Sequence, residues 1–298
     1  MAHDDALARD FENERPRLLR VAYSTTGSLA EAEDCVQEAW LRLRRVPDPG
    51  AIRDLRGWLT TVVGRLALDA LGSARSRRER YVGTWLPEPL VEPAGVVPAD
   101  PAEQVTLDES VSMALLVVLD ELSPAQRTAF LLHDVFGLPF DQVAEVVGRT
   151  PAAVRQLASR ARRHVERNRP HEPAPRAEQW RLVHAFAAAC REGDLEGLVR
   201  LLDPEVTWRG DGGGLVTSLP GVVRGAEQVA HGLVAFGRAP LPPGMMRVVT
   251  VNGAAGLVWY GPEGEVSVVA FTVDGGRITA IDVQRNPEKL TSVRFPEP

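Results

Sequence analysis

The stretch FDQVAEVVGRTPAAVRQLASRARRHVER, residues 140–167, carries the most specific local pattern in the sequence. Its first part, FDQVAEVVG, is typical of a short helix, and Gly148-Arg149-Thr150 is typical of a tight turn. A second helix is predicted to start at Pro151, with Thr150 as its N-cap. Two helices joined by a turn of this kind form a helix-turn-helix.

The second helix of this motif has one apolar face and one polar face. Val154, Ala158 and Val165 mark the inward side, and the outward side is rich in arginine. Glutamine suits adenine and arginine suits guanine in a major groove, whereas flanking arginines such as Arg155 and Arg162 suit phosphates. A merely solvated helix is the alternative, but turn, cap, spacing and charge together favour DNA contact. The predicted contact residues are Thr150, Arg155, Gln156, Ser159, Arg160 and Arg163.

Two longer helices are predicted earlier in the chain. Ser28 and Glu31 have capping-box spacing and introduce a helix over residues 29–46, on which Leu41 lies opposite the apolar stripe. A second helix covers about residues 54–81 and ends in a basic tail. Stacking side chains and cations are what single-stranded DNA binding requires, although the position of Trp58 on the apolar face favours a core role over a DNA contact.

Charge is partitioned along the 298 residues in a way that the net charge of −6 hides. Residues 85–148 carry one arginine against 11 acidic residues, whereas residues 149–177 carry eight arginines against two. Local concentrations of charge, rather than the net value, decide whether a surface attracts phosphate. The acidic segment could discourage DNA binding by the free protein and offer docking sites to basic faces.

The remaining composition favours a cytoplasmic protein without a metal. Cys35 and Cys190 lie far apart and form no CxxC pair, so neither a zinc cluster nor a disulfide scaffold is expected. The first residues are acidic, and no run of 18 apolar residues occurs, so neither a signal peptide nor a membrane span is expected. No cofactor is expected.

Proline-rich stretches divide the chain into three bodies. The predicted domains are residues 1–84 and 105–169, separated by a proline-rich acidic linker over 85–104, and residues 178–298, which follow a linker over 170–177. In the last domain, two helices and the strand-like VTWRG precede a further helix and the strand-like runs MRVVTV, AGLVWYG, EVSVVAFTV and RITAIDVQ. This order predicts an α+β cone.

Two segments carry family resemblances: EAEDCVQEAWLRLRRV followed by RGWLTTVVGRLALDAL, and LDELSPAQRTAFLLHDVFGLPFDQVAEVVGRTPAAVRQLASRARRHV. The first is similar to region 2 and the second to region 4 of bacterial sigma factors. A chain with only these two regions resembles the extracytoplasmic-function (ECF) class. The resemblance implies two all-α sigma domains, a region 2 helical bundle and a region 4 helix-turn-helix. It also implies a subunit that binds core RNA polymerase and recognises promoter DNA.

The resemblance assigns roles to residues of the first body. Contact with core polymerase is implied for Asp34, Gln37, Glu38, Leu41 and Arg45. Contact with the minus-10 element is implied for Arg53, Trp58, Thr60, Thr61, Arg65, Arg75 and Arg78. The helix-turn-helix would read the minus-35 element. The chain departs from the common pattern at Gly64-Arg65, where similar sequences carry Asn before Arg.

The last domain is similar in order and length to the SnoaL-like fold, which includes polyketide cyclases and small isomerases. Sigma factors with such a fused domain also resemble this chain in three motifs, which implies regulation by contact between this domain and the sigma domains. The motif residues are Trp85, Leu86, Pro87, Glu88, Pro89, Asp211, Gly212, Gly213, Gly214, Asn286, Pro287, Glu288, Lys289 and Leu290.

Two other functions stay open for comparison. The cone could bind an unidentified small ligand, or act as an enzyme through Trp208, Asp211, Trp259 and either His184 or His231, although no nucleophile or metal set is identifiable. The whole chain could instead be a helix-turn-helix regulator fused to a small-molecule-binding or cyclase-like domain. The first body's helix pair has no role in that alternative, so a regulated sigma factor without enzymatic activity is the favoured prediction.

Overall fold

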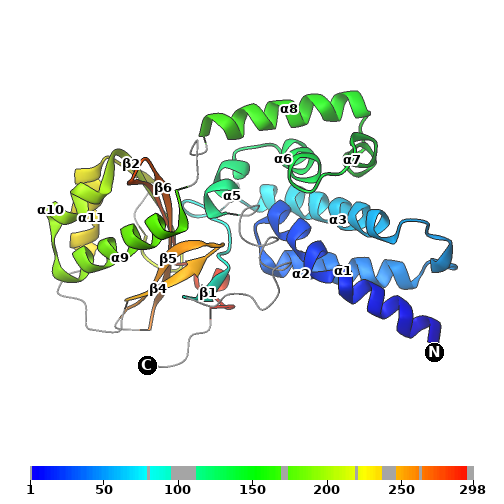
Figure 1. Ribbon diagram of the computed structural model, residues 1–298, viewed down its shortest axis with the longest axis horizontal. Coiled ribbons are helices and arrows are strands. Elements are labelled where there is room, and N and C mark those ends of the chain that lie inside the picture. The colour runs from blue at the N-terminus through cyan, green and yellow to red at the C-terminus, as the bar shows by residue number, and fades with distance from the viewer. Residues whose placement is uncertain are drawn as a thin grey trace. The chain divides into compact units, whose positions relative to one another are not determined.

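The chain folds into two compact units, seen in a computed structural model that describes residues 2–78, 81–94, 112–168, 174–218, 221–236, 246–261 and 264–293 (Figure 1). Met1–Glu79 and Val118–Asn168 form the first unit, and Arg80–Val117 and Arg169–Pro298 form the second. This division differs from the three predicted bodies. None of the described helices is long and apolar enough to cross a membrane.

The first unit begins with three long helices that pack on one another. They are α1 (Ala2–Thr26), α2 (Leu29–Arg44) and α3 (Leu55–Arg78), with the short η1 (Pro49–Ala51) before α3. The hydroxyl of Ser28 accepts a hydrogen bond from the Glu31 backbone N–H, which confirms the predicted start of α2. Helix α1, which the apolar periodicity did not predict, buries Leu18, Val21 and Ala22 in the shared core.

The second half of this unit contains the helix-turn-helix. Helix α6 (Pro124–Phe130) continues into a π-turn, η2 (Leu131–Val135), and α7 (Phe140–Val147) and α8 (Pro151–Asn168) follow. Gly148 ends α7 with φ of 67°, a conformation that glycine adopts without strain, and the Thr150 hydroxyl accepts from the Ala153 N–H at the start of α8. The predicted motif is confirmed.

The two halves of the first unit pack directly against each other. A Cβ at Gly64 on α3 would lie 3.2 Å from Val146 and 3.3 Å from Leu132, so the missing side chain permits a close approach by α7. Arg127, 1% exposed, donates hydrogen bonds from Nε and Nη2 to the Ser24 carbonyl at the end of α1. These contacts explain why the segments predicted as two domains form one unit.

The second unit is built on a curved sheet in the order β1-β4-β5-β6-β7-β2-β3. All neighbouring strands are antiparallel except β2 and β7. The strands predicted over β4 to β7 are confirmed, whereas β1 and β3 were not predicted. The bounds are β1 (Val91–Pro93), β2 (Leu202–Asp211), β3 (Val222–Arg224), β4 (Met246–Val251), β5 (Ala254–Tyr260), β6 (Val266–Asp274) and β7 (Arg277–Gln284).

Both faces of this sheet are covered. Helices α9 (Arg176–Glu192), α10 (Leu195–Leu201) and α11 (Ala226–Phe236) pack on one face around Trp208 and Phe271. The other face buries Leu86, together with Met113 and Val117 of α5 (Met113–Asp120), which crosses the boundary between the units. The predicted linker is therefore part of the sheet domain over residues 85–93, because β1 adds to its edge and Leu86 enters its core.

Candidate nucleic-acid interface and connector site

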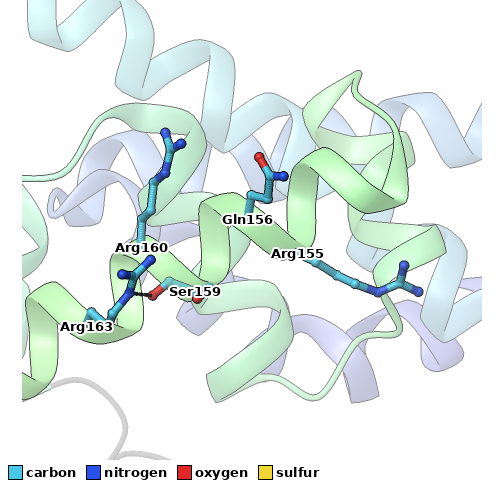
Figure 2. A pocket seen from close by; sticks show the side chains of 5 residues that line it. All are labelled: Arg155, Gln156, Ser159, Arg160 and Arg163. Atoms are coloured by element: carbon cyan, nitrogen blue, oxygen red, sulfur yellow. Dashed lines mark hydrogen bonds between the residues drawn. The ribbon is translucent and has the colours of Figure 1, made fainter.

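The polar face of α8 encloses a hollow of about 380 Å³. It is lined by Arg155, Gln156, Ser159, Arg160 and Arg163, whose side chains project from successive turns of the helix (Figure 2). The opposite face is apolar and buried, which fixes the orientation of the polar one. The structure thus brings together five of the six residues predicted to contact the minus-35 element, and the sixth, Thr150, caps the same helix.

Local contacts orient two of these arginines. The Arg155 guanidinium carbon lies 5.2 Å from the centre of the Phe140 ring, a cation–π geometry that leaves its positive charge uncompensated. Arg163 Nε donates to the Ser159 carbonyl at 3.3 Å (Figure 2). The surface therefore offers guanidinium groups and one amide at fixed places along α8, which suits the edges of bases and their neighbouring phosphates.

The residues predicted for the minus-10 element are placed unequally. Arg53 is exposed, and Trp58 and Thr61 are half-buried, so all three have some solvent access. Thr60 is 1% exposed, its hydroxyl accepting from Arg17 Nη2 at 2.8 Å and donating to the Arg56 carbonyl. In this conformation the Thr60 hydroxyl is buried between α1 and its own helix, so its contact with DNA stays a prediction that would require a rearrangement.

Arg65 is exposed but is held by the helix-turn-helix. Its Nε and Nη2 donate to the carbonyl of Glu145, at 3.1 and 2.9 Å. In this conformation the group predicted to contact DNA from α3 therefore contacts α7 instead. The side chains of Arg75 and Arg78, at the end of α3, lie outside the described residues.

The outward face of α2 has the predicted composition. Asp34, Gln37 and Arg45 are exposed, and Glu38 pairs with Arg42 at 3.0 Å. Leu41 is 38% exposed among these polar groups. An apolar side chain ringed by polar ones suits a protein contact, which supports the role predicted for it.

A buried carboxylate joins the connector to the sheet domain. Asp211, at the end of β2, is fully buried and accepts five hydrogen bonds. Oδ1 accepts from the Tyr81 hydroxyl at 2.6 Å and from the Gly213 N–H, while Oδ2 accepts from the Leu86 N–H, Gln284 Nε2 and Lys289 Nζ. Burial and the Asp211 hydrogen bond raise the pKa of Tyr81 well above its usual 10.0.

Lys289 closes this connector site. Its ammonium lies 2.6 Å from Asp211 Oδ2 and 2.7 Å from the Leu86 carbonyl, and it stands 4.2 Å from the centre of the Trp85 ring. Asn286 Nδ2 donates to the Tyr81 hydroxyl. Three motifs far apart in the sequence, at 85–89, 211–214 and 286–290, thus meet at one buried ion pair.

The other predicted residues of the motifs contribute in different ways. Gly213 has φ of 64°, and a Cβ there would lie 2.5 Å from Asn286 Nδ2, so glycine is required where the loop passes Asn286. Pro287 and Glu288 are exposed, and the Glu288 N–H donates to Asn286 Oδ1, which orients that side chain. The remaining motif residues are buried except Gly214, which is exposed: Pro87, Glu88, Pro89, Gly212 and Leu290 make up the buried group, with Gly212 in the loop after β2.

The groups considered for catalysis do not meet. The carboxylate of Asp211 is bound by the connector on the sheet face opposite the cluster that contains Trp208. His184 and His231 are exposed on α9 and α11. Asp282, whose pKa is raised by burial against the effect of Arg209, is held by that arginine at 2.6 Å. Within the described residues, no group of His, Cys, Asp or Glu could hold a metal.

Comparison with known families matches both helical segments. The "Sigma-70 region 2" family matches residues 11–77, and the "Sigma-70, region 4" family matches residues 112–165. The sequence is 43% identical to the ECF RNA polymerase sigma factor SigJ of Mycobacterium tuberculosis, over 95% of this chain and 92% of that protein. It is 36% identical to the probable ECF sigma factor SigI of the same species, over 99% and 98% of the two chains.

Comparison of folds agrees with the sequence. The crystal structure of Mycobacterium tuberculosis SigJ matches with a TM-score of 0.78 and 39% identity, covering 95% of this chain and 98% of that one. The match extends through the sheet domain as well as the helical unit, because it spans nearly all of both chains. The chain belongs to the sigma-70 family, as a sigma factor of the extracytoplasmic-function class.

Proposed function

We propose that the chain directs core RNA polymerase to promoters through three surfaces and that its sheet domain controls this activity in cis. Helix α8 reads the minus-35 element, α3 with Arg53, Trp58 and Thr61 engages the minus-10 strand, and the outward face of α2 holds the polymerase. The observation that carries the assignment is the hollow on α8, where arginines and Gln156 stand without any carboxylate among the lining residues. Such a protein acts in the cytoplasm, where polymerase and DNA are found.

The case for regulation in cis rests on the connector. Helix α3 ends at Arg78, and residues 81–93 are already bound along the sheet domain, so that domain holds the chain a few residues after the minus-10 helix. Any rearrangement that requires a free connector must first break the Asp211–Lys289 site. Because the site is buried, its opening is a discrete event and suits a two-state control.

The closed first unit supports the same proposal. Arg65 and Gly64 of α3 pack on α7, so the proposed minus-10 helix is held against the helix-turn-helix while the polar face of α8 stays open. Two elements at separate places on a promoter require the two modules to separate. The free protein is therefore in a form that must open before it can initiate transcription, and release of the connector is the step that the sheet domain controls.

Transcription from fragmented genomic DNA tests the assignment and needs no promoter chosen in advance. Core polymerase with the full chain should give transcripts whose 5′ ends share a two-element sequence upstream, and core polymerase alone should not. Leu41→Ala should lower output by weakening polymerase binding. Arg160→Ala should cost about 1–3 kcal/mol at one base position, whereas a phosphate contact would weaken all promoters alike. Absence of promoter-dependent transcripts contradicts the sigma function.

A truncation and a point variant test the regulatory part. Removing residues after Ala177, or introducing Asp211→Asn, should raise the affinity for core polymerase and change promoter output. Glu196→Gln is the matched control, because the Glu196 carboxylate is exposed on α10 and pairs with Arg200 rather than with a residue of the connector site. Unchanged polymerase affinity and output in both test proteins would refute control by the sheet domain while leaving the sigma function intact.

A further inference from the structure

The π-turn before the helix-turn-helix places an acidic side chain against α8. The Phe136 N–H reaches back five residues to the Leu131 carbonyl, which widens the turn over η2. Two consecutive residues of this turn engage elements of the motif: His133 stacks on Phe140, with ring centres 3.7 Å apart, and Asp134 binds Arg162. Single π-helical turns within α-helices often occur at functional sites. The position of His133 and Asp134 in such a turn therefore points to a role beyond packing.

Two hydrogen bonds join the side chains of Asp134 and Arg162. Arg162 donates from both Nε, at 2.8 Å, and Nη2 to the same carboxylate oxygen. The Asp134 side chain is 16% exposed and that of Arg162 is 46% exposed. If Arg162 moved to a DNA phosphate, the Asp134 carboxylate would lose its counter-ion, and a negative charge would be left facing the helix that approaches DNA.

The neighbouring residues Arg155, Arg160 and Arg163 of α8 make contacts of a different kind. Arg155 lies over an aromatic ring, which orients its charge without cancelling it. Arg160 and Arg163 line the hollow, and neither has a carboxylate within ion-pair distance in the described part of the chain. Arg162 lies between these two in the sequence but does not line the hollow. Asp134 therefore neutralises Arg162, whereas Arg155, Arg160 and Arg163 of the same helix keep their charge available for a ligand.

We propose that Asp134 limits sequence-independent DNA binding by holding Arg162 off the phosphate backbone. Each arginine that contacts a phosphate strengthens binding to every sequence equally, whereas base contacts discriminate. Neutralising Arg162, which lies beside the reading face, removes a non-specific contact and leaves that face unchanged. The inference rests on the proposed contact of α8 with DNA and names the residue that keeps the contact selective.

The salt dependence of binding to a duplex of random sequence tests this inference. Full-length chain and a labelled duplex of about 20 bp are titrated by fluorescence anisotropy between about 50 and 200 mM KCl, and log K is plotted against log salt. Asp134→Asn should steepen the slope by about 0.9, which is about a three- to fourfold larger change in affinity over this range. Arg162→Ala should keep the wild-type slope, and the double variant should match Arg162→Ala.

Controls separate this mechanism from a simple change of charge. Glu166→Gln removes an exposed acidic group from the same helix without releasing an arginine, and it should leave the slope unchanged. If Asp134→Asn steepens the slope as much in the Arg162→Ala background, Asp134 acts through its own charge and the inference is wrong. It is also wrong if Arg162→Ala alone flattens the slope by about 0.9, because Arg162 would then already contact phosphate.

Thermal unfolding of each variant checks that it folds. If Asp134→Asn unfolds at the assay temperature, the inference is tested by Arg162→Ala alone. The salt slope of duplex binding by Arg162→Ala must then equal that of the wild type. Failure of the underlying function gives a different result: Arg155→Ala and Arg160→Ala would then leave binding to any duplex unchanged, so that α8 makes no contact with DNA.

Discussion

Replacing Asp211 with Asn should release the connector from the sheet domain. The carboxylate offers two acceptor oxygens to five donors, and it is the counter-ion of Lys289 at 2.6 Å. An asparagine keeps the shape but accepts at one oxygen only, and its NH₂ group would face donors. Removing one partner of a buried ion pair costs about 3–5 kcal/mol, since the other charge is left uncompensated.

Hydrogen exchange measures this loss at a single group. The Leu86 N–H donates to Asp211 Oδ2 at 2.9 Å, so it exchanges only when the connector opens. A loss of about 3 kcal/mol or more should speed its exchange by about a hundredfold or more, given about 1.4 kcal/mol for each factor of ten. Peptides that cover residues 81–93 report this exchange by mass spectrometry.

The matched control is Asp203→Asn on the same strand. Its carboxylate accepts from the Glu205 N–H near the start of β2, at the other end of the strand from Asp211, so exchange at Leu86 should stay at the wild-type rate. Wild-type exchange at Leu86 in a folded Asp211→Asn protein would refute the reasoning, because the buried pair would then contribute nothing to holding the connector.

Three further predictions concern packing, pH and thiol reactivity. Gly64→Leu should cost about 1–3 kcal/mol and speed amide exchange in α7, because even a Cβ there would lie 3.2 Å from Val146. Gly72→Leu on the same helix, where a Cβ meets nothing within 4 Å, should do neither, and equal effects would contradict the α3–α7 contact. Because the pKa of Tyr81 is raised by burial and by its bond to Asp211, the unfolded state loses that proton first, so this stabilisation is complete below about pH 10 and declines above it. The free energy of unfolding should therefore fall more steeply above about pH 10 in the wild type than in Tyr81→Phe, and parallel curves would oppose this account. Burial, reinforced by Glu31, Asp34 and Asp69, raises the pKa of the Cys35 thiol to about 11, so iodoacetamide at about pH 8 should modify the native protein far more slowly than the unfolded one, as peptide mapping would show.

Local signals were sufficient to predict the helix-turn-helix and the polar face of α8. Thr150, Pro151 and Gly148 act through neighbours within a few residues, and the spacing of apolar residues fixes which side of α8 is buried. The same holds for the start of α2 at Ser28. These features depend on contacts between residues a few positions apart, so they can be predicted from the sequence.

The features that were missed depend on partners far away in the chain. Thr60 looked available on α3, but that helix packs on α1, α2 and α7, so no single face of it is free in the way that periodicity suggests. Arg65 finds the Glu145 carbonyl 80 residues later. The motifs of the connector site were predicted by resemblance, whereas their meeting at Asp211, 125 residues from Leu86, required the fold.

Acidic residues of this negatively charged chain act on basic groups through short-range pairs rather than through a long-range electrostatic field. Within the first unit, acidic residues of the segment 85–148 reach basic groups one by one: Asp134 binds Arg162, Asp120 binds Arg127, and Glu121 lies 3.0 Å from His164. Two of these pairs involve α8 and leave its hollow untouched. At physiological salt a distant acidic cluster would be screened over about 8 Å, whereas partly buried contact pairs are screened much less. Under the proposed role of Asp134, selectivity for DNA would depend on which arginine each acidic residue contacts rather than on the net charge of the chain.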